Sequence, residues 1–321
     1  MVALSPETPW VSVPQPRHSG HDPSETELPT KGETPKPISV ISEPLTSSDL
    51  LSGLFLLTNN ADQVEIAPGV LGVNPVAISK YPNGLAALEG NDSVRGSTDS
   101  EQIMGNQGQD TLEGQGGDDT LRGGQEFDLL YGGVGNDLLN GNLGDDYVYG
   151  NEGNDLLRGG QGNDALVGEA GNDTLIGDMG LDRLWGGEGA DVFVLRTDTA
   201  TPAMSDALPS DNGVGDVDTI SADFILDYNA AQGDVIGLTE GLTVNDLVIT
   251  QETLTYGDLR DYQSSGPFPL DQIRTADFQI ETVSVTVMTI AETGNILGLV
   301  KGVSPGQLQF VSVDHNILGK G

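Results

Sequence analysis

A nine-residue period of acidic side chains runs from Ala87 to Leu195 and limits this stretch to a repeat fold. The acids in phase are Asp92, Glu101, Asp110, Asp119, Asp128, Asp137, Asp146, Asp155, Asp164, Asp173, Asp182 and Asp191. The second residue after each acid is apolar in all twelve units. The fifth residue before it is Gly in every unit except the first, which has Ala87. Twelve units in one register predict stacked, repeated coils.

Each nonapeptide is expected to form a six-residue, Gly-rich turn and a three-residue strand. In a strand, the apolar residue points to one face and its two neighbours point to the other. These single apolar residues can line a narrow core only if the chain coils, with one strand of each coil in each of two facing sheets. We therefore predict an all-β, parallel β-roll of two nonapeptides per coil, with coils about 4.8 Å apart.

The turns have the donor atoms of a hard-cation site. Glycine allows the backbone conformations that aim peptide carbonyls inward, beside one carboxylate per turn. Oxygen ligands without His or Cys favour calcium over zinc, copper or iron, and calcium accepts flexible geometry. Besides the eleven Asp of the series, the expected ligands are the backbones of Gly114, Gly117, Gly132, Gly133, Gly135, Gly141, Gly144, Gly150, Gly153, Gly159, Gly160, Gly162, Gly168 and Gly171.

Acids two repeats apart should meet across neighbouring coils, which gives ten pairs. The turns Gly96 to Glu101 and Gly123 to Asp128 depart from the pattern, so we expect them to bind weakly or not at all. Between Ala87 and Leu195 there are 22 Asp and Glu against 4 Arg, a net charge of −18, which eight calcium ions (+16) nearly neutralise. We expect about six to ten ions, and folding that depends on them.

The whole chain is strongly acidic, with a formal charge of −36 over 321 residues and no cysteine. This charge argues against nucleic acid and anionic membrane surfaces as partners, because like charges repel. No apolar run is long enough to span a bilayer, and the N-terminus lacks the pattern of a cleaved signal peptide. Partners are therefore expected to be cations.

Four regions are expected. Residues 1–48, rich in Pro, Ser, Thr and Glu, should be a disordered leader, with a polyproline ligand as the alternative. Residues 49–86 should close the stack as an N-terminal cap, and residues 87–195 form the roll. Residues 196–321 should form a mostly β cap, with strands at 217–220, 224–228, 235–238, 247–250, 279–290, 296–300 and 309–313.

The residues beside each inward position should lie on the outer faces of the two sheets. One face presents Leu129, Tyr131, Tyr147, Tyr149, Val167 and Trp185, and the other presents Leu138, Asn140, Leu156, Arg158, Thr174 and Ile176. The first face is apolar for a surface. We expect the flanking cap to lie across it; the alternative is a platform for sugar rings or a protein through Tyr131, Tyr147, Tyr149 and Trp185.

No catalytic constellation is visible in the sequence. The histidines are His18, His21 and His315, and no metalloprotease, serine-hydrolase or phosphate-loop motif occurs. Acids committed to calcium are ionised and are poor general acids. We expect no enzyme, although an unrecognised activity in the C-terminal cap stays open.

The repeats, with forms such as Asn136-Asp137 and the closing Gly186-Gly187-Glu188-Gly189-Ala190-Asp191, resemble the hemolysin-type calcium-binding (RTX) family. The segments around Asp223 and Asp234 are similar to those that trail such blocks, especially in cyanobacterial members. The resemblance implies export by a type I system that reads an uncleaved C-terminal signal, followed by folding on extracellular calcium.

The sequence therefore predicts a secreted calcium-binding protein whose roll has a structural or adhesive role. The alternative is a calcium-buffering module without a dedicated partner, for which an intracellular location is open. Affinity separates them, because extracellular modules bind calcium at about 10⁻⁴–10⁻³ M and cytosolic buffers at about 10⁻⁹–10⁻⁸ M.

Overall fold

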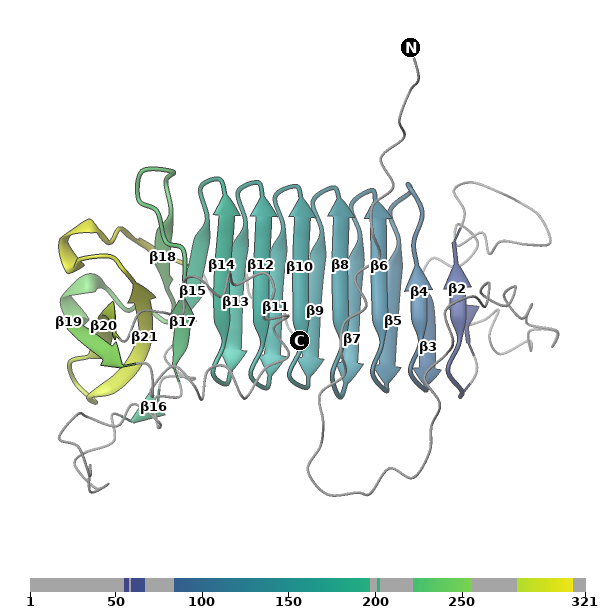
Figure 1. Cartoon of the computed structure of the whole chain (residues 1–321), viewed down its shortest axis with the longest axis horizontal. Helices are drawn as coiled ribbons and strands as arrows, with labels where there is room; N and C mark the ends of the chain where they lie inside the picture. Colours follow the sequence, from purple (N-terminus) through teal and green to yellow (C-terminus); the bar gives the residue numbers. More distant parts are fainter. Residues whose placement is uncertain are drawn as a thin grey trace, which may run out of the picture.

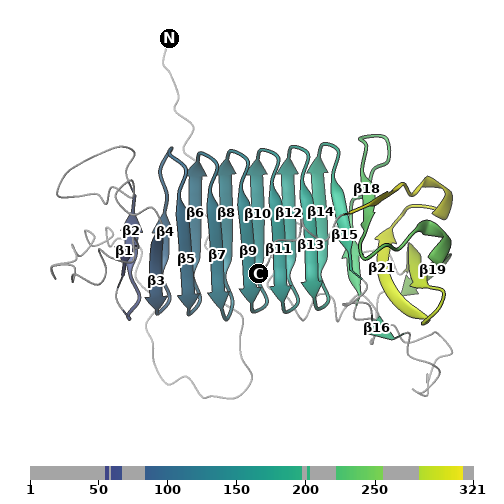
Figure 2. The ribbon, with the colours of Figure 1, turned by 180° about the vertical axis from the view of Figure 1, so that it is seen from behind.

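The computed structural model describes residues 55–57, 59–66, 84–196, 201–202, 222–255 and 282–313. They form two facing sheets that run the length of an elongated stack, as the views from the front and from behind show (Figures 1 and 2). The predicted leader at 1–48 and the predicted strand at 217–220 lie outside the described residues.

The ten-stranded sheet contains, in order of pairing, β1 (Phe55–Leu56), β3 (Leu85–Glu89), β5 (Gln102–Gln107), β7 (Thr120–Gln125), β9 (Leu138–Leu143), β11 (Leu156–Gln161), β13 (Thr174–Met179), β15 (Val192–Leu195), β18 (Val235–Leu238) and β22 (Phe310–Ser312).

The twelve-stranded sheet contains β19 (Leu247–Thr255), β20 (Thr282–Ile290), β21 (Asn295–Lys301), β17 (Asp223–Ile225), β14 (Arg183–Glu188), β12 (Ala165–Ala170), β10 (Tyr147–Glu152), β8 (Leu129–Val134), β6 (Thr111–Gly116), β4 (Ser93–Arg95) and β2 (Gln63–Glu65), with β16 (Thr201–Pro202) paired to β21.

Successive repeats alternate between the sheets, so each strand pairs in parallel with the strand two repeats away. Val148 of β10, for example, lies between Leu130 of β8 and Leu166 of β12, each 18 positions away. The same register holds in the other sheet, where Leu157 of β11 lies between Leu139 and Leu175. The predicted all-β parallel roll with two nonapeptides per coil is confirmed.

The core of the roll is a file of one apolar side chain per repeat. Each of the twelve predicted inward residues has at most 1% of its surface exposed, and all belong to one continuous cluster. These side chains are shielded from solvent, and their burial is the main apolar contribution to the stability of the roll.

The expected division of each repeat into a six-residue turn and a three-residue strand is wrong in its lengths. Strands β5 to β14 have six residues each and include most of the Gly-rich segment. The reason is that this segment also pairs with the neighbouring coil, as Asn151 and Glu152 of β10 pair with Glu169 and Ala170 of β12. Left-handed residues such as Gly133 (φ 115°) keep it from being a regular strand.

Strands outside the repeats extend both sheets at each end. At the N-terminal end β1 pairs with β3 and β2 pairs with β4. At the C-terminal end β17 and β18 continue the parallel stack, and β19, β20 and β21 form an antiparallel meander. Two short 3-10 helices, η2 (Val244–Asp246) and η4 (Pro305–Gln307), lie in the connections.

The predicted strand at 235–238 matches β18, and those at 224–228, 247–250, 279–290, 296–300 and 309–313 overlap β17, β19, β20, β21 and β22. The described part of the chain contains no helix long and apolar enough to cross a membrane.

Candidate metal centre

The periodic acids stand directly before the strands and form two files along opposite edges of the stack. Their burial is nearly complete, at 0–4% exposure. We call the acids before the ten-stranded sheet the ten-strand ladder: Glu101, Asp119, Asp137, Asp155, Asp173 and Asp191. Those before the other sheet are the twelve-strand ladder: Asp92, Asp110, Asp128, Asp146, Asp164 and Asp182.

Within each ladder, consecutive acids are joined through the backbone. The Oδ1 atom of each Asp accepts a hydrogen bond from the backbone N–H of the acid one coil earlier, as between Asp155 Oδ1 and Asp137 N (2.7 Å). The structure brings together all ten expected pairs in this way, at 2.6–2.9 Å.

The second carboxylate oxygen of these Asp residues has no partner. The Oδ2 atoms of all eleven are buried and make no hydrogen bond. In the ten repeats that have Gly five residues before the Asp, this Oδ2 lies against that Gly, and in most of them the carbonyl of the Gly one coil later lies there too. At Gly150, for example, an added Cβ would collide with Asp155 Oδ2 and would lie 2.9 Å from Gly168 O.

This convergence of carboxylate and carbonyl oxygens is present at eight of the eleven positions: Asp110, Asp119, Asp128, Asp137, Asp146, Asp155, Asp164 and Asp173. Two acceptors that face one another in a dry site repel unless a donor or a cation lies between them. Eight repeat positions therefore have oxygens placed to hold a cation.

Burial raises the pKa of the ladder acids when no cation is present. The pKa rises to about 8 for Asp119 and about 9 for Asp128, and the charges of neighbouring acids add to the effect. The hydrogen bond that each Oδ1 accepts from a backbone N–H lowers the pKa, but by less than burial raises it. A bound cation would remove this cost, because it stabilises the ionised form of both carboxylates beside it.

The donor set fits calcium. Among the described residues, no group of three or more His, Cys, Asp or Glu side chains converges on one point, so backbone carbonyls must supply the remaining ligands. A mixture of carbonyl and carboxylate oxygens without nitrogen or sulfur is the set that calcium takes in proteins.

The predicted glycines fall into three groups. Six lie beside an Oδ2 atom: Gly114, Gly132, Gly141, Gly150, Gly159 and Gly168. Six more, at left-handed φ, lie against the backbone of the previous coil in the turn: Gly117, Gly135, Gly144, Gly153, Gly162 and Gly171. Gly133 and Gly160 face the backbone of the previous coil away from the carboxylates, so their position indicates close packing of coils.

The two turns expected to bind weakly differ from each other. Glu101 is satisfied within its own turn, because Ser97 N and Ser97 Oγ donate to its two carboxylate oxygens. Asp128, by contrast, keeps an unpartnered Oδ2 beside Gly123 and Gly141 O, although Glu126 and Phe127 precede it. The geometry of the second turn matches that of the regular turns.

Three acids that the period missed continue the ladders. Asp92 Oδ1 accepts from Asp62 N (2.6 Å), and Asp191 N donates to Asp234 Oδ1 (3.2 Å). Asp223 lies beside Asp182, since Phe224 pairs with Arg183. Their spacing breaks the nine-residue period, but each keeps the other signal, an apolar residue two positions after the acid (Val64, Ile225 and Ile236).

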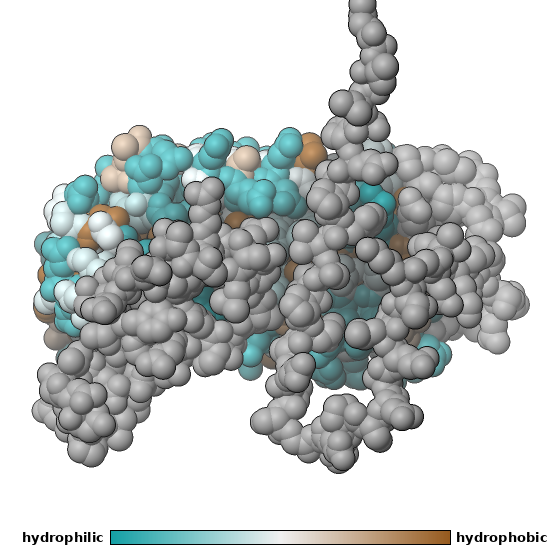
Figure 3. Space-filling model, viewed as in Figure 1, coloured by the Kyte–Doolittle hydropathy of each residue, from teal (hydrophilic) through white to brown (hydrophobic). Residues whose placement is uncertain are grey.

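The apolar outer face is only partly as expected. Tyr131 and Tyr149 stack with ring centroids 5.1 Å apart, and Tyr147 is 2% exposed. The described C-terminal strands do not lie across this face. They extend the sheets lengthwise, because β17 pairs with β14 and β18 pairs with β15. In the view of Figure 3, hydrophilic residues predominate along the upper edge of the stack.

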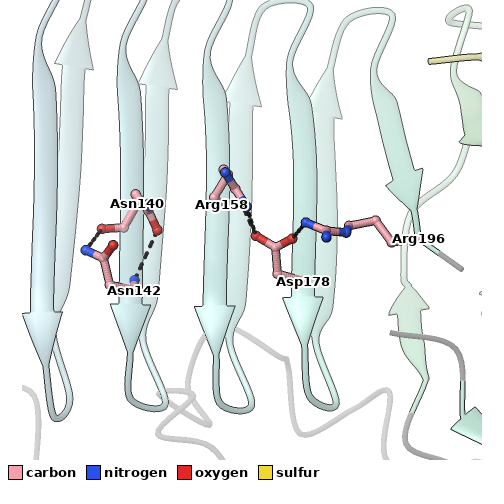
Figure 4. Close-up of polar contacts among 5 residues, drawn as sticks. All are labelled: Asn140, Asn142, Arg158, Asp178 and Arg196. Carbon is pink, nitrogen blue, oxygen red and sulfur yellow. Dashed lines mark hydrogen bonds and ion pairs between the residues drawn. The ribbon is translucent and has the colours of Figure 1, made fainter. Parts of the chain in front are cut away.

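The outer face of the ten-stranded sheet carries an open groove, whose lining includes Asn140, Asn142, Arg158, Asp178 and Arg196. Asp178 pairs with Arg158 (Nη2 to Oδ2, 2.6 Å) and with Arg196, from the neighbouring strand and from the end of β15 (Figure 4). Asn142 donates to the side chain and the carbonyl of Asn140 (3.1 and 3.3 Å). The predicted outward positions Asn140 and Arg158 thus lie together, while Ile176 is buried.

Comparison with known proteins agrees with the repeat geometry. The sequence matches the family described as RTX calcium-binding nonapeptide repeat (4 copies) over residues 85–112, 95–130, 113–148, 122–157, 131–166 and 158–193. No curated protein matches the chain significantly.

One similar solved structure is the crystal structure of the extracellular lipase LipA from Serratia marcescens. It is 17% identical, with a TM-score of 0.23, over 78% of this chain and 42% of that chain. This chain therefore spans less than half of the lipase, and a TM-score this low carries no argument about function.

Proposed function

Since residues 85–193 are RTX-type calcium-binding repeats, we propose that this is a secreted protein whose roll folds on binding calcium and serves a structural or adhesive role. The observation that supports it best is the set of eleven buried, unpartnered Asp Oδ2 atoms. Left alone, so many desolvated acceptors would each cost about 1–3 kcal/mol. Calcium outside the cell would convert this cost into binding free energy that drives folding.

The proposal assigns the ligands residue by residue. The eight Asp positions with a converging glycine carbonyl form the main sites, and Asp92 is a weaker position because Ala87 stands where the other Asp residues have Gly. Glu101 is not assigned an ion, because its oxygens accept from Ser97. Eight ions fall within the predicted range of about six to ten.

The proposal gives the chain no catalytic activity and leaves the partner of the roll open to test. The stacked Tyr131 and Tyr149 are the groups that a sugar ring or a protein would contact, together with Trp185 of the same face. Export and extracellular location rest on the family resemblance and on the calcium dependence proposed for folding.

A calcium titration of the chelated full-length protein, followed by far-UV circular dichroism, tests the proposal. A cooperative gain of β signal at about 0.1–1 mM calcium, with no gain in magnesium, is expected. Saturation below about 1 µM would favour the alternative, an intracellular buffer, since cytosolic buffers bind at about 10⁻⁹–10⁻⁸ M. No response to calcium would contradict both.

A further inference from the structure

The last acids of the two ladders keep only half of the oxygen set seen in the other coils. Asp182 and Asp191 are both 0% exposed, and the Oδ2 atom of each has no partner. At Gly177 and Gly186, the three atoms nearest to an added Cβ all belong to the Asp of the same repeat. At the eight Asp positions with a converging carbonyl, one of the three nearest atoms is instead the carbonyl oxygen of the glycine one coil later.

Residues from outside the repeats occupy the next level of each ladder. Phe224 N donates to Asp182 O (2.8 Å), as Arg183 N donates to Asp164 O (2.9 Å) one coil earlier. This backbone match places Asp223, which is 5% exposed, at the position that a further repeat acid would have.

The ten-strand ladder continues in the same manner. Val235 N donates to Asp191 O (2.9 Å), and Asp191 N donates to Asp234 Oδ1 (3.2 Å). The other oxygen of Asp234 accepts from Asn229 N (2.8 Å), and Asp234 is 2% exposed. Because both oxygens of Asp234 accept an N–H, Asp234 forms no cation position of its own, as Glu101 does not. It can contact an ion at the unpartnered Oδ2 of Asp191 through its remaining lone pairs.

The chain forms these two acid pairs across 41 and 43 residues rather than 18, so the repeat period does not enforce them. Two buried carboxylates side by side are unfavourable without a counter-charge. Each pair also retains one fully buried oxygen without a partner, on Asp182 and on Asp191. A cation between the two acids of each pair would account for both observations.

We infer that Asp223 and Asp234 complete terminal calcium positions at Asp182 and Asp191, and that calcium thereby joins the C-terminal strands to the roll. The inference rests on the calcium binding proposed above. Asp223 is the first residue of β17, and Asp234 directly precedes β18. Strand β17 pairs with β21, and β18 pairs with β22. Loss of either ion would therefore loosen its strand without disturbing the central coils.

The test counts calcium ions per chain by equilibrium dialysis of the full-length protein and follows amide hydrogen exchange of β17 and β18. Asp223→Asn and Asp234→Asn should each bind one ion fewer than wild type. Their own strand should exchange as fast as in chelator, while β8 to β12 stay protected. Asp246→Asn is the matched control, because Asp246 is an exposed acid in η2 whose carboxylate accepts hydrogen bonds from Thr243.

A variant that binds as many ions as wild type and keeps its strand protected overturns the inference for its position. Loss of protection in β8 to β12 as well would overturn it too, because a terminal position should act locally. Asp137→Asn tests the central coils separately from the terminal positions. If Asp137→Asn loses an ion and the two terminal variants do not, the proposed calcium binding of the roll stands and only the terminal positions fail. If wild type binds no calcium, the proposed function fails first.

Discussion

The repeat strands β6, β8, β10, β12 and β14 share one sheet with strands β19 to β21, but the two groups of strands are stabilised differently. Each repeat strand contributes one residue to the central apolar file and follows a buried carboxylate. The C-terminal meander pairs antiparallel and packs Val285, Val287 and Leu299 against Phe224. Among the described residues, no acid after Asp234 is buried.

This difference separates two ways to stabilise a sheet. The meander balances its ordering entropy with apolar burial alone, as ordinary domains do. The roll adds desolvated charges that only a ligand can neutralise, so its stability is set by the ligand concentration. Four changes, ordered from the largest expected effect to the smallest, would break or sharpen this contrast.

Truncation of the core should be most damaging. Leu139→Ala removes a 0% exposed side chain from the file and should destabilise the calcium-saturated protein by about 2–5 kcal/mol, measured by chemical denaturation. Leu143→Ala, at a position that is 42% exposed, is the control and should change stability by less than about 0.5 kcal/mol. Equal losses would show that the file is not the core of the roll.

Filling a cation position should come next. Gly150→Ala places a Cβ on Asp155 Oδ2 and should remove one bound ion and about 1–3 kcal/mol of stability, without removing a carboxylate. The ion count comes from equilibrium dialysis. In Gly116→Ala, the nearest atom to the new Cβ is Val134 O at 3.7 Å, so this control should bind the full number. An unchanged count in Gly150→Ala would contradict the assigned position.

Acidification should replace part of the effect of calcium. Burial raises the pKa of Asp119 to about 8 and of Asp128 to about 9 from 3.8, so the calcium-free folded coil binds more protons than the unfolded chain between these values. Its stability therefore rises as the pH falls through that window and is lost as the pH rises. The effect is smaller than that of calcium, because a protonated carboxyl donates one hydrogen bond to the facing carbonyl, whereas calcium binds about six to eight oxygens.

Far-UV circular dichroism in chelator between pH 8 and about pH 4.5 measures this effect, with the expected gain of β signal at the acid end. With subsaturating calcium the sign reverses, since protons compete for the same oxygens. Absence of any β gain on acidification in chelator would mean that the carboxylates do not limit folding.

The smallest effect is expected from the surface. Arg95 and Glu113 form an ion pair with 3.6 Å between Nε and Oε2, and the Arg95 side chain is 48% exposed. Arg95→Ala should change stability by about 0–1 kcal/mol and leave the ion count unchanged. A shift in the thermal midpoint larger than that of Gly150→Ala would place this pair among the determinants of the roll.

The sequence predicted the roll well because its signal is periodic. The acid and the apolar residue two positions later specify the register of Asp137 with Asp155 and of Leu139 with Leu157, and both pairings are present. A repeat can be predicted in this way since each coil meets only its neighbours.

The ends of the ladders were not predictable from the period. Asp223 and Asp234 join them across 41 and 43 residues, and no local spacing encodes such a contact. The hydrogen bond from Ser97 Oγ to the Glu101 carboxylate depends on the orientation of the Ser97 side chain, which the sequence does not determine. The length of the strands was missed because turn residues bond to the next coil, a contact that appears only when the coils stack.

The most direct test of the contrast is hydrogen exchange of the wild-type protein, compared region by region in saturating calcium and in chelator. The account predicts that amides of β8 to β12 are protected with calcium and exchange rapidly without it. Amides of β20 and β21 should keep much more of their protection. Equal protection of β8 to β12 in both conditions would contradict the claim that the buried carboxylates need a cation.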